Sequence, residues 1–210
     1  MRFEFHREPD GRAGVRVDRF DADDGRVGDA WLWIDSPLAD PTPDMAAAAA
    51  ALTFGNLVGS VFDPPRGMSS HMAEAVFVYL GKRHLRPVRV SNDAVRSRGA
   101  QTLRLHSGQA VNHQALGVDA LNLHLVAGDM HYGQQASRGA LAIPSNSQFF
   151  AAHLGLKDAW RVDVAGALLA ASRLDVGHVR LVGYGVSPKE LLAAARLTLS
   201  AGVRLDAEGA

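Results

Sequence analysis

The chain has 210 residues, 47% of them hydrophobic, with 22 basic and 22 acidic side chains and a formal net charge of zero. This composition predicts one domain with a substantial core, and the lack of a basic excess argues against nucleic acid as a partner. The chain has no cysteine, which excludes disulfides, thiolate catalysis and thiolate metal sites.

Two features of the sequence argue against targeting to a membrane. The N-terminus carries charge from Arg2 onward and does not resemble a signal peptide. The longest uncharged run, residues 45–62, is rich in alanine and interrupted by glycine, so a buried helix is expected there rather than a membrane span. We therefore expect a cytoplasmic protein, and the frequent arginine and alanine are typical of a high-GC bacterial genome.

The first fifty residues predict strands followed by a helix of small residues. Residues 2–6 and 14–20 flank a Pro-Asp-Gly-Arg turn, which indicates a β-hairpin. Residues 30–35 are apolar on both faces and favour a central strand. Asp44 precedes an alanine-rich run and is the expected N-cap of a helix of about ten residues. Its small side chains would allow a close approach of another element.

The stretch from residue 57 to residue 90 predicts a strand, a loop, a helix and a second strand. Five apolar residues in it recur at helical spacing: Met72, Ala75, Val76, Tyr79 and Leu80. Ser69 or Ser70 can cap this helix, and Glu74 lies in its first turns, where the helix dipole favours a carboxylate. The basic residues 82–84 are expected in its last turn.

The start of that helix is the candidate ligand site. The loop of residues 63–71 would place side chains beside a helix end whose N–H groups are free, which suits a phosphate or carboxylate. Four of its residues would hold the ligand: Arg66, Gly67, Ser69 and Ser70. His71 is a candidate for moving protons. The alternative is an ordinary capped loop with a solvated arginine.

Two families share short motifs with this loop. Pro65-Arg-Gly-Met-Ser-Ser-His-Met-Ala resembles the phosphate loop of GHMP small-molecule kinases, although the glycine before the serines is missing and the chain is short for that fold. The same Pro-Arg-Gly string, Ala73-Glu-Ala-Val-Phe and Leu181-Val-Gly are similar to formaldehyde-activating enzymes, whose catalytic histidine has no counterpart in residues 52–61. These matches cover under a fifth of the chain, so no residue role is carried over.

Residues 102–106 and 121–125 predict two strands that share a polar face. Their leucines alternate with polar residues, which are Arg104 and His106 in the first strand and Asn122 and His124 in the second. If the strands pair, His106 and His124 fall on one face. Both are therefore candidates for acid–base catalysis, and Arg104 is a candidate for ligand binding.

Histidines also raise the question of a metal site, because four of them fall in one segment: His106, His113, His124 and His131. Neutral imidazoles can hold zinc or another divalent ion. No HExxH or similar signature is present, and solvent-facing strand histidines are the simpler interpretation, so no metal is assigned. Gly183-Tyr-Gly185 lacks the third glycine of a dinucleotide-binding loop, so no cofactor is assigned.

The last third of the chain predicts three helices and a strand. Residues 145–148 have capping-box spacing ahead of a helix that Gly155 would end, and Asp163 is the expected cap of an alanine- and leucine-rich helix. Residues 178–185 form the last predicted strand. A capping box with proline at its first helical position then opens a helix over residues 188–201.

We therefore expect an α/β or α+β fold: a single domain over residues 1–210, in which alanine-rich helices pack on a mixed sheet of about six to eight strands, with a β-rich insertion as an option at residues 91–143. The expected function is that of a small-molecule enzyme, or an enzyme-like domain, that binds an anionic metabolite at the loop of residues 63–71. The alternative is a non-enzymatic, homo-oligomeric or structural subunit that uses its alanine-rich helices as contacts.

Overall fold

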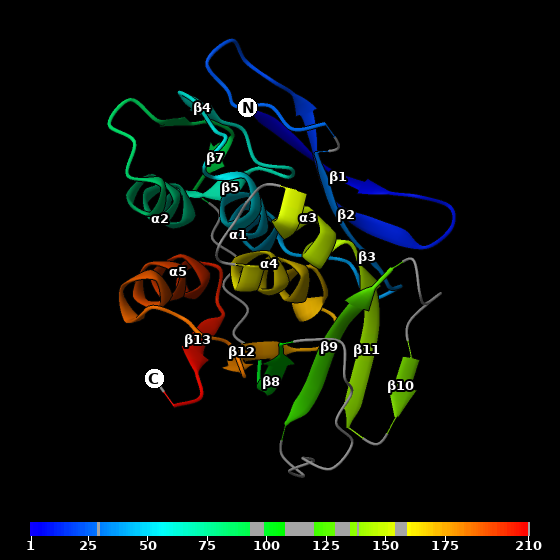
Figure 1. Ribbon diagram of the computed structural model, residues 1–210. Coiled ribbons are helices and arrows are strands. Elements are labelled where there is room, and N and C mark those ends of the chain that lie inside the picture. Colours follow the sequence, from blue (N-terminus) through cyan, green and yellow to red (C-terminus); the bar gives the residue numbers. More distant parts are fainter. Residues whose placement is uncertain are drawn as a thin grey trace.

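The computed structural model describes residues 1–28, 30–92, 99–107, 120–128, 135–137, 139–153 and 159–209. A mixed sheet in the order β1-β2-β3-β11-β9-β8-β12-β13 carries helices on it, and this confirms the predicted fold (Figure 1). The strands of that path are β1 (Arg2–Arg7), β2 (Arg12–Arg19), β3 (Trp31–Asp35), β8 (Gln101–His106), β9 (Leu121–Ala127), β11 (Ala140–Ser145), β12 (Val176–Val182) and β13 (Arg204–Ala207). The short β10 (Gln135–Ser137) pairs with β11.

The sheet has an antiparallel part and a parallel part. The predicted hairpin forms β1 and β2, and β3 continues the antiparallel pairing. The pair Ser145↔Ile34 then joins β3 to β11. From β11 to β13 all neighbouring strands are parallel. β8, β9 and β11, which come from the segment predicted as an insertion, lie in the middle of this sheet.

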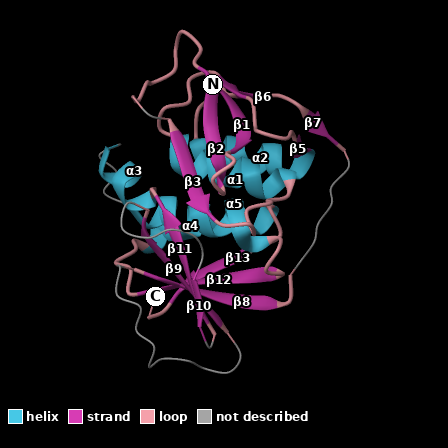
Figure 2. Ribbon diagram, turned by 90° about the vertical axis from the view of Figure 1, so that its right-hand side faces the viewer, coloured by secondary structure: helices cyan, strands magenta, loops and turns pink. Residues whose placement is uncertain are grey.

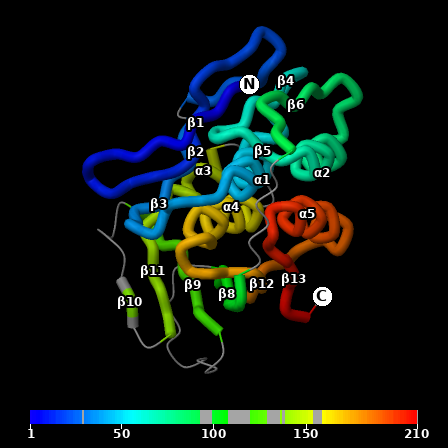
Figure 3. The backbone as a smooth tube through the Cα atoms, turned by 180° about the vertical axis from the view of Figure 1, so that it is seen from behind, coloured from blue at the N-terminus to red at the C-terminus, as the bar shows by residue number. Residues whose placement is uncertain are grey.

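The helices are α1 (Pro43–Phe54), α2 (Ser70–Leu80), α3 (Ser147–His153), α4 (Ala159–Ala171) and α5 (Pro188–Ser200). Figures 1 and 2 show them gathered on one side of the sheet, with α1 and α4 in the middle. Figure 3 shows α2 and α5 next to each other at the edge of this layer, where the two helices pack together. Among the described residues, no helix combines the length and the apolar character that crossing a bilayer requires.

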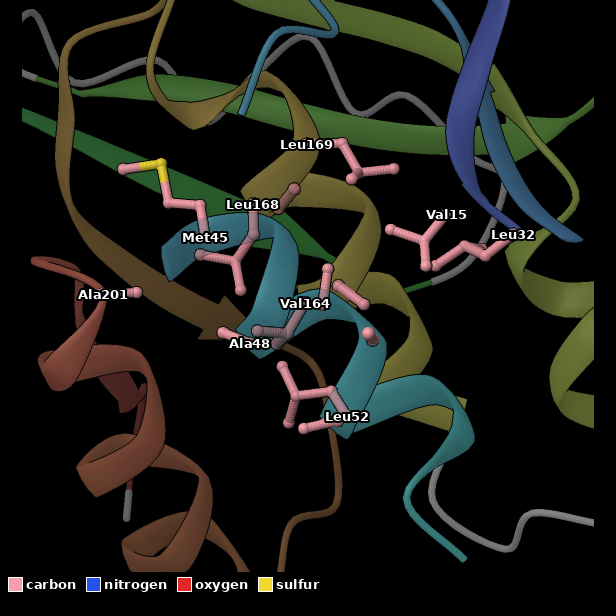
Figure 4. Close-up of a cluster of buried hydrophobic side chains, with 14 of the residues drawn as sticks. Val15, Leu32, Met45, Ala48, Leu52, Val164, Leu168, Leu169 and Ala201 are labelled. Carbon is pink, nitrogen blue, oxygen red and sulfur yellow. The ribbon is translucent and has the colours of Figure 1, made fainter. Parts of the chain in front are cut away.

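The contact between α1 and α4 forms the centre of the core (Figure 4). Residues 46–51, all alanine, are at most 1% exposed, and the larger Met45, Leu52 and Leu168 fill the space around them. Gly166 lets α4 approach the sheet, because a Cβ there would come within 2.8 Å of a Leu125 methyl carbon. The small side chains therefore serve packing inside the chain, and they are not available as contacts between copies.

The stretch around α2 forms its own substructure beside the main sheet. β4 (Val61–Phe62) pairs with β6 (Arg86–Pro87), and β5 (Met68–Ser69) pairs with β7 (Val90–Ser91), in two short parallel ladders. α2 itself forms as predicted but ends at Leu80, because Gly81 adopts a left-handed conformation with φ of 62°. The basic residues 82–84 therefore follow the helix instead of occupying its last turn.

Two of the predicted N-caps are wrong. Thr42 caps α1 by accepting a hydrogen bond from the Met45 N–H at 3.2 Å, with Pro43 in the first turn, so that Asp44 lies inside the helix. Asp163 also lies inside its helix, because α4 already includes Ala159. In both cases an aspartate ahead of an apolar run has the pattern of a cap but is a buried residue of the helix.

One further helix start and one predicted capping box also differ from the prediction. Pro144 and Ser145 finish β11, and α3 begins at Ser147, whose N–H donates to the Ser145 hydroxyl at 3.0 Å. α5 starts at Pro188 as expected, but Ser187 makes no side-chain capping bond, and Glu190 pairs with Arg161 at 3.2 Å instead. The predicted helix end at Gly155 lies outside the described residues.

Candidate functional site

The structure divides the predicted site residues among three places. The first is a cavity of about 330 Å³ at the start of α2, lined by Thr42, Pro43, Asp44, Arg66, Gly67, Met68, Ser69, Arg89 and Ser91. We call it the α2 cavity. Ser70, the first residue of α2, is exposed and is not part of its lining. His71 lines a separate groove between α2 and α5, and Arg104, His106 and His124 lie on the sheet.

The N-terminus of α2 is held by a side chain of the protein itself. The Ser69 N–H and hydroxyl donate to the two oxygens of Asp44, at 2.7 and 2.8 Å, and the Ser69 hydroxyl accepts from the Met72 N–H at 3.1 Å. Asp44 and Ser69 are both buried. The expectation of a free helix end is therefore wrong: Ser69, one of the two predicted caps, is the N-cap, and a carboxylate from α1 already occupies the position next to it.

Two arginines line the α2 cavity, and each has a partner. Arg66 donates from Nη1 to Asp40 at 3.2 Å and to the Pro41 carbonyl at 3.1 Å, and its guanidinium stacks over Phe5. Hydrogen bonding from Arg66, helped by Arg173, lowers the pKa of Asp40. Within the described residues, Arg66 uses none of its other N–H groups, so a ligand in the cavity could still reach them.

Arg89 reaches the same cavity from the bend between β6 and β7, after α2. Its guanidinium contacts Asp63 and the Pro64 carbonyl. Its backbone is left-handed, with φ of 53°, which is uncommon for a residue other than glycine. Gly67 faces it with φ of 80°, and a Cβ there would come within 3.0 Å of the Arg89 carbonyl oxygen. This close approach of two loops fixes the rim of the cavity, at some cost in backbone strain.

The histidine pair on the sheet forms as predicted. Parallel pairing of β8 with β9 sets His106 opposite His124, and their rings stack with centroids 4.6 Å apart. His106 Nε2 lies 2.8 Å from Asn122 Oδ1, so the tautomer with a proton on Nε2 donates to the amide oxygen. His124 and Asn122 are 2% and 3% exposed, so the interpretation of solvent-facing strand histidines does not hold for β9.

The described residues do not gather ligands for a metal around this pair. They contain no group of three or more histidine, aspartate, glutamate or cysteine side chains that could hold an ion, whereas His113 and His131 lie outside them. Arg104, on the same strand as His106, donates to both carboxylate oxygens of Glu208 at 3.1 Å. It is therefore engaged with the C-terminal segment that follows β13.

A buried acid that the sequence analysis misread lies at the carboxyl end of the parallel strands. Burial raises the pKa of Asp163, which is 6% exposed, while the Ser147 and Tyr184 hydroxyls act in the opposite direction. Burial and the nearby Asp163 also raise the pKa of Tyr184. The Tyr184 hydroxyl lies 2.9 Å from Asp163 Oδ2 and 3.1 Å from the His106 carbonyl oxygen.

These distances favour the protonated form of Asp163. The Tyr184 hydroxyl has one proton but faces two acceptors. If Asp163 is protonated, it donates to the tyrosine oxygen, and the tyrosine proton is free for the His106 carbonyl. The other oxygen of Asp163 is buried and makes no hydrogen bond within the described residues. The nearest sequence signal was an aspartate in an alanine-rich run, which reads equally well as a cap.

Of the three places, the α2 cavity combines a defined volume with a buried carboxylate and two guanidinium groups. It also contains three of the predicted ligand-binding residues, Arg66, Gly67 and Ser69. Comparison with known proteins found no match, whether to a family model, to a curated sequence or to a solved structure.

Proposed function

We propose that the protein binds a small metabolite in the α2 cavity, and that this ligand carries both an acidic group and a hydroxyl or ammonium group. The observation that carries the proposal is the pairing of a buried acceptor with cationic walls: Asp44 is 7% exposed, while Arg66 and Arg89 line the same cavity. The Asp44 carboxylate would repel a simple anion. A ligand with an acidic group at one end and a donor group at the other would match both the arginines and Asp44.

Lone pairs remain on Asp44 for such a donor. Each of its oxygens accepts one hydrogen bond from Ser69, and a carboxylate oxygen can accept two. The acidic group of the ligand would lie against the guanidinium of Arg66, with Arg89 and the Ser91 side of the cavity beside it. A volume of about 330 Å³ is near the lower end for ligand pockets, which favours a compact metabolite.

The proposal covers binding, because none of the predicted catalytic histidines is among the described residues that line the α2 cavity. His71 lines the neighbouring groove, and His106 and His124 lie on β8 and β9. Proton transfer by these histidines therefore stays a prediction, and it would need a substrate that reaches beyond the α2 cavity.

Thermal unfolding in the presence of chosen compounds tests the proposal. The panel contains acetate and inorganic phosphate as simple anions, and lactate, serine and glycerol phosphate as compounds with both groups. A ligand that binds only the folded state adds about 2.7 kcal/mol to the free energy of unfolding at a concentration of about 100 Kd, and it raises the Tm accordingly. Compounds with both groups should bind more tightly, so at the same concentration they should raise the Tm more than simple anions do. No rise with any compound would overturn the proposal.

Two arginine variants locate the effect. Arg66→Gln removes a cavity charge, so it should weaken binding of the compound that raises the Tm about tenfold or more, as measured by calorimetry. Arg173→Gln is the matched control, because Arg173 pairs with the same Asp40 at 2.8 Å but does not line the cavity. Equal weakening by both variants would show that the ligand does not contact Arg66.

A further inference from the structure

The packing of α2 against α5 leaves an apolar groove of about 580 Å³ on the surface, which we call the α2–α5 groove. Val78, Leu192 and Leu199 line it and are 60%, 53% and 54% exposed. Phe77, also on α2, is 42% exposed. Exposed large apolar side chains that gather in one place are typical of a protein–protein contact.

The two walls of the groove carry opposite charges. α2 contributes Glu74, and α5 contributes Lys189 and Arg196. Within the described residues, none of these three side chains takes part in an ion pair. Charged groups on the rim of an apolar patch that have no partner in the same chain can select the partner and fix its orientation.

The helices run in opposite directions along the groove. The C-terminal part of α2, with Tyr79 and Leu80, lines a second pocket together with Ser187 and Lys189 at the start of α5. Glu74 lies five residues before Tyr79, and Arg196 lies seven residues after Lys189. At about 1.5 Å per residue, Glu74 and Arg196 are therefore at nearly the same height, on opposite walls.

From this arrangement we propose that the groove is the interface of a homodimer whose two-fold axis runs along it. Such an axis places α2 of each copy over α5 of the other. Rotation about it does not change the position of any residue along the groove. Glu74 then meets Arg196 of the second copy, and the same pair forms twice. Leu192 and Val78 would be buried between the copies. A two-fold axis perpendicular to the groove would instead place α2 of one copy on α2 of the other, and α5 on α5. It would bring the acidic walls together and the basic walls together.

This inference is independent of the proposed ligand, because the α2 cavity and the α2–α5 groove share no lining residue. The contact also differs from the one expected from the sequence, since the alanine-rich α1 and α4 are buried in the core. The surface helices α2 and α5 would form the contact.

Sedimentation equilibrium over a range of protein concentrations tests the dimer and its surface. The parent chain should show a monomer–dimer equilibrium, and Leu192→Glu should raise the dissociation constant by about tenfold or more. The control is Phe149→Glu, which places a carboxylate on a side chain that is 68% exposed on α3, outside the groove. A parent that stays monomeric, or a dimer that both variants leave equally intact, would overturn the proposal.

Charge reversal tests the direction of the axis. Glu74→Arg and Arg196→Glu should each weaken the dimer about fivefold to tenfold. In either variant, both copies of the Glu74–Arg196 pair become pairs of like charges that repel each other. The double variant restores opposite charges and should recover most of the parent affinity. Failure of the double variant to recover affinity, while circular dichroism shows a folded chain, would exclude the pairing of Glu74 with Arg196.

Discussion

The two alanine-rich helices in the centre of the molecule each bury one aspartate, and the surroundings of the two carboxyl groups differ. Asp44, in the first turn of α1, accepts hydrogen bonds from the Ser69 N–H and hydroxyl. Asp163, inside α4, has the Tyr184 hydroxyl 2.9 Å from its Oδ2 and the Ser147 hydroxyl nearby, while its Oδ1 makes no hydrogen bond within the described residues. The two residues are 7% and 6% exposed, so burial alone does not distinguish them.

The two buried carboxyl groups differ in the hydrogen-bond donors around them. Asp44 lies in the first turn of α1 and accepts hydrogen bonds from both donor groups of Ser69. Within the described residues no backbone N–H donates to the Asp163 carboxyl group, and the Tyr184 hydroxyl beside it has a single proton and a second acceptor, the His106 carbonyl. We therefore expect Asp44 to act as a structural group that holds Ser69, and Asp163 to act as a neutral acid up to a higher pH than an exposed aspartate.

The largest effect is expected at Asp44. Asp44→Ala removes both acceptors of Ser69 and leaves its N–H buried without a partner, so the free energy of unfolding should fall by about 3 kcal/mol. Urea unfolding at a fixed protein concentration measures this loss. Asp40→Ala, which removes an exposed carboxylate with two arginine partners, is the control and should cost about 0.5 kcal/mol. Similar losses for the two variants would contradict the structural role of Asp44.

A smaller loss is expected at Tyr184. Tyr184→Phe removes the hydroxyl that contacts Asp163 and the His106 carbonyl, at a cost of about 1 kcal/mol in urea unfolding. A double-mutant cycle with Asp163→Asn would then separate the two contacts, because only the contact with Asp163 is shared by both changes. An energy of coupling near zero would mean that the tyrosine hydroxyl interacts mainly with the His106 carbonyl.

The same comparison explains how much of the fold could be predicted. Local periodicity was sufficient for the hairpin of β1 and β2 and for α2 and α5, since each depends on neighbours in sequence. It also placed His106 and His124 on one face on the condition that their strands pair, and the parallel pairing of β8 with β9 meets that condition. It was insufficient for Asp44 and Asp163. An aspartate ahead of an apolar run has the pattern of a cap, whether it caps or is buried.

For the candidate site, the limit was the distance in sequence between the residues that meet. Arg66, Gly67 and Ser69 are consecutive or nearly so, and a single loop brings them together as predicted. Asp44 is 25 residues from Ser69, and Arg89 lies between β6 and β7, after α2, so no local pattern indicated that they would complete the cavity. Only packing of α1 against the start of α2 places the Asp44 carboxyl there.

The smallest change in stability, with a distinctive dependence on pH, is expected for Asp163→Asn. Burial raises the pKa of Asp163 above its unfolded value, so the folded state holds the proton more tightly. The stability that comes from this tighter proton binding is fully present below the unfolded pKa and is lost as the pH rises through the folded pKa.

The asparagine variant has no proton to lose at this position. It should differ from the parent by about 0.5 kcal/mol or less near pH 4 and become the more stable protein as the pH rises through the folded pKa of Asp163. Asp40→Asn is the control of opposite sign, because Arg66 and Arg173 lower the pKa of Asp40 and its contribution is lost as the pH falls. Unfolding free energies measured across this range would contradict the protonated Asp163 if parent and Asp163→Asn followed parallel curves.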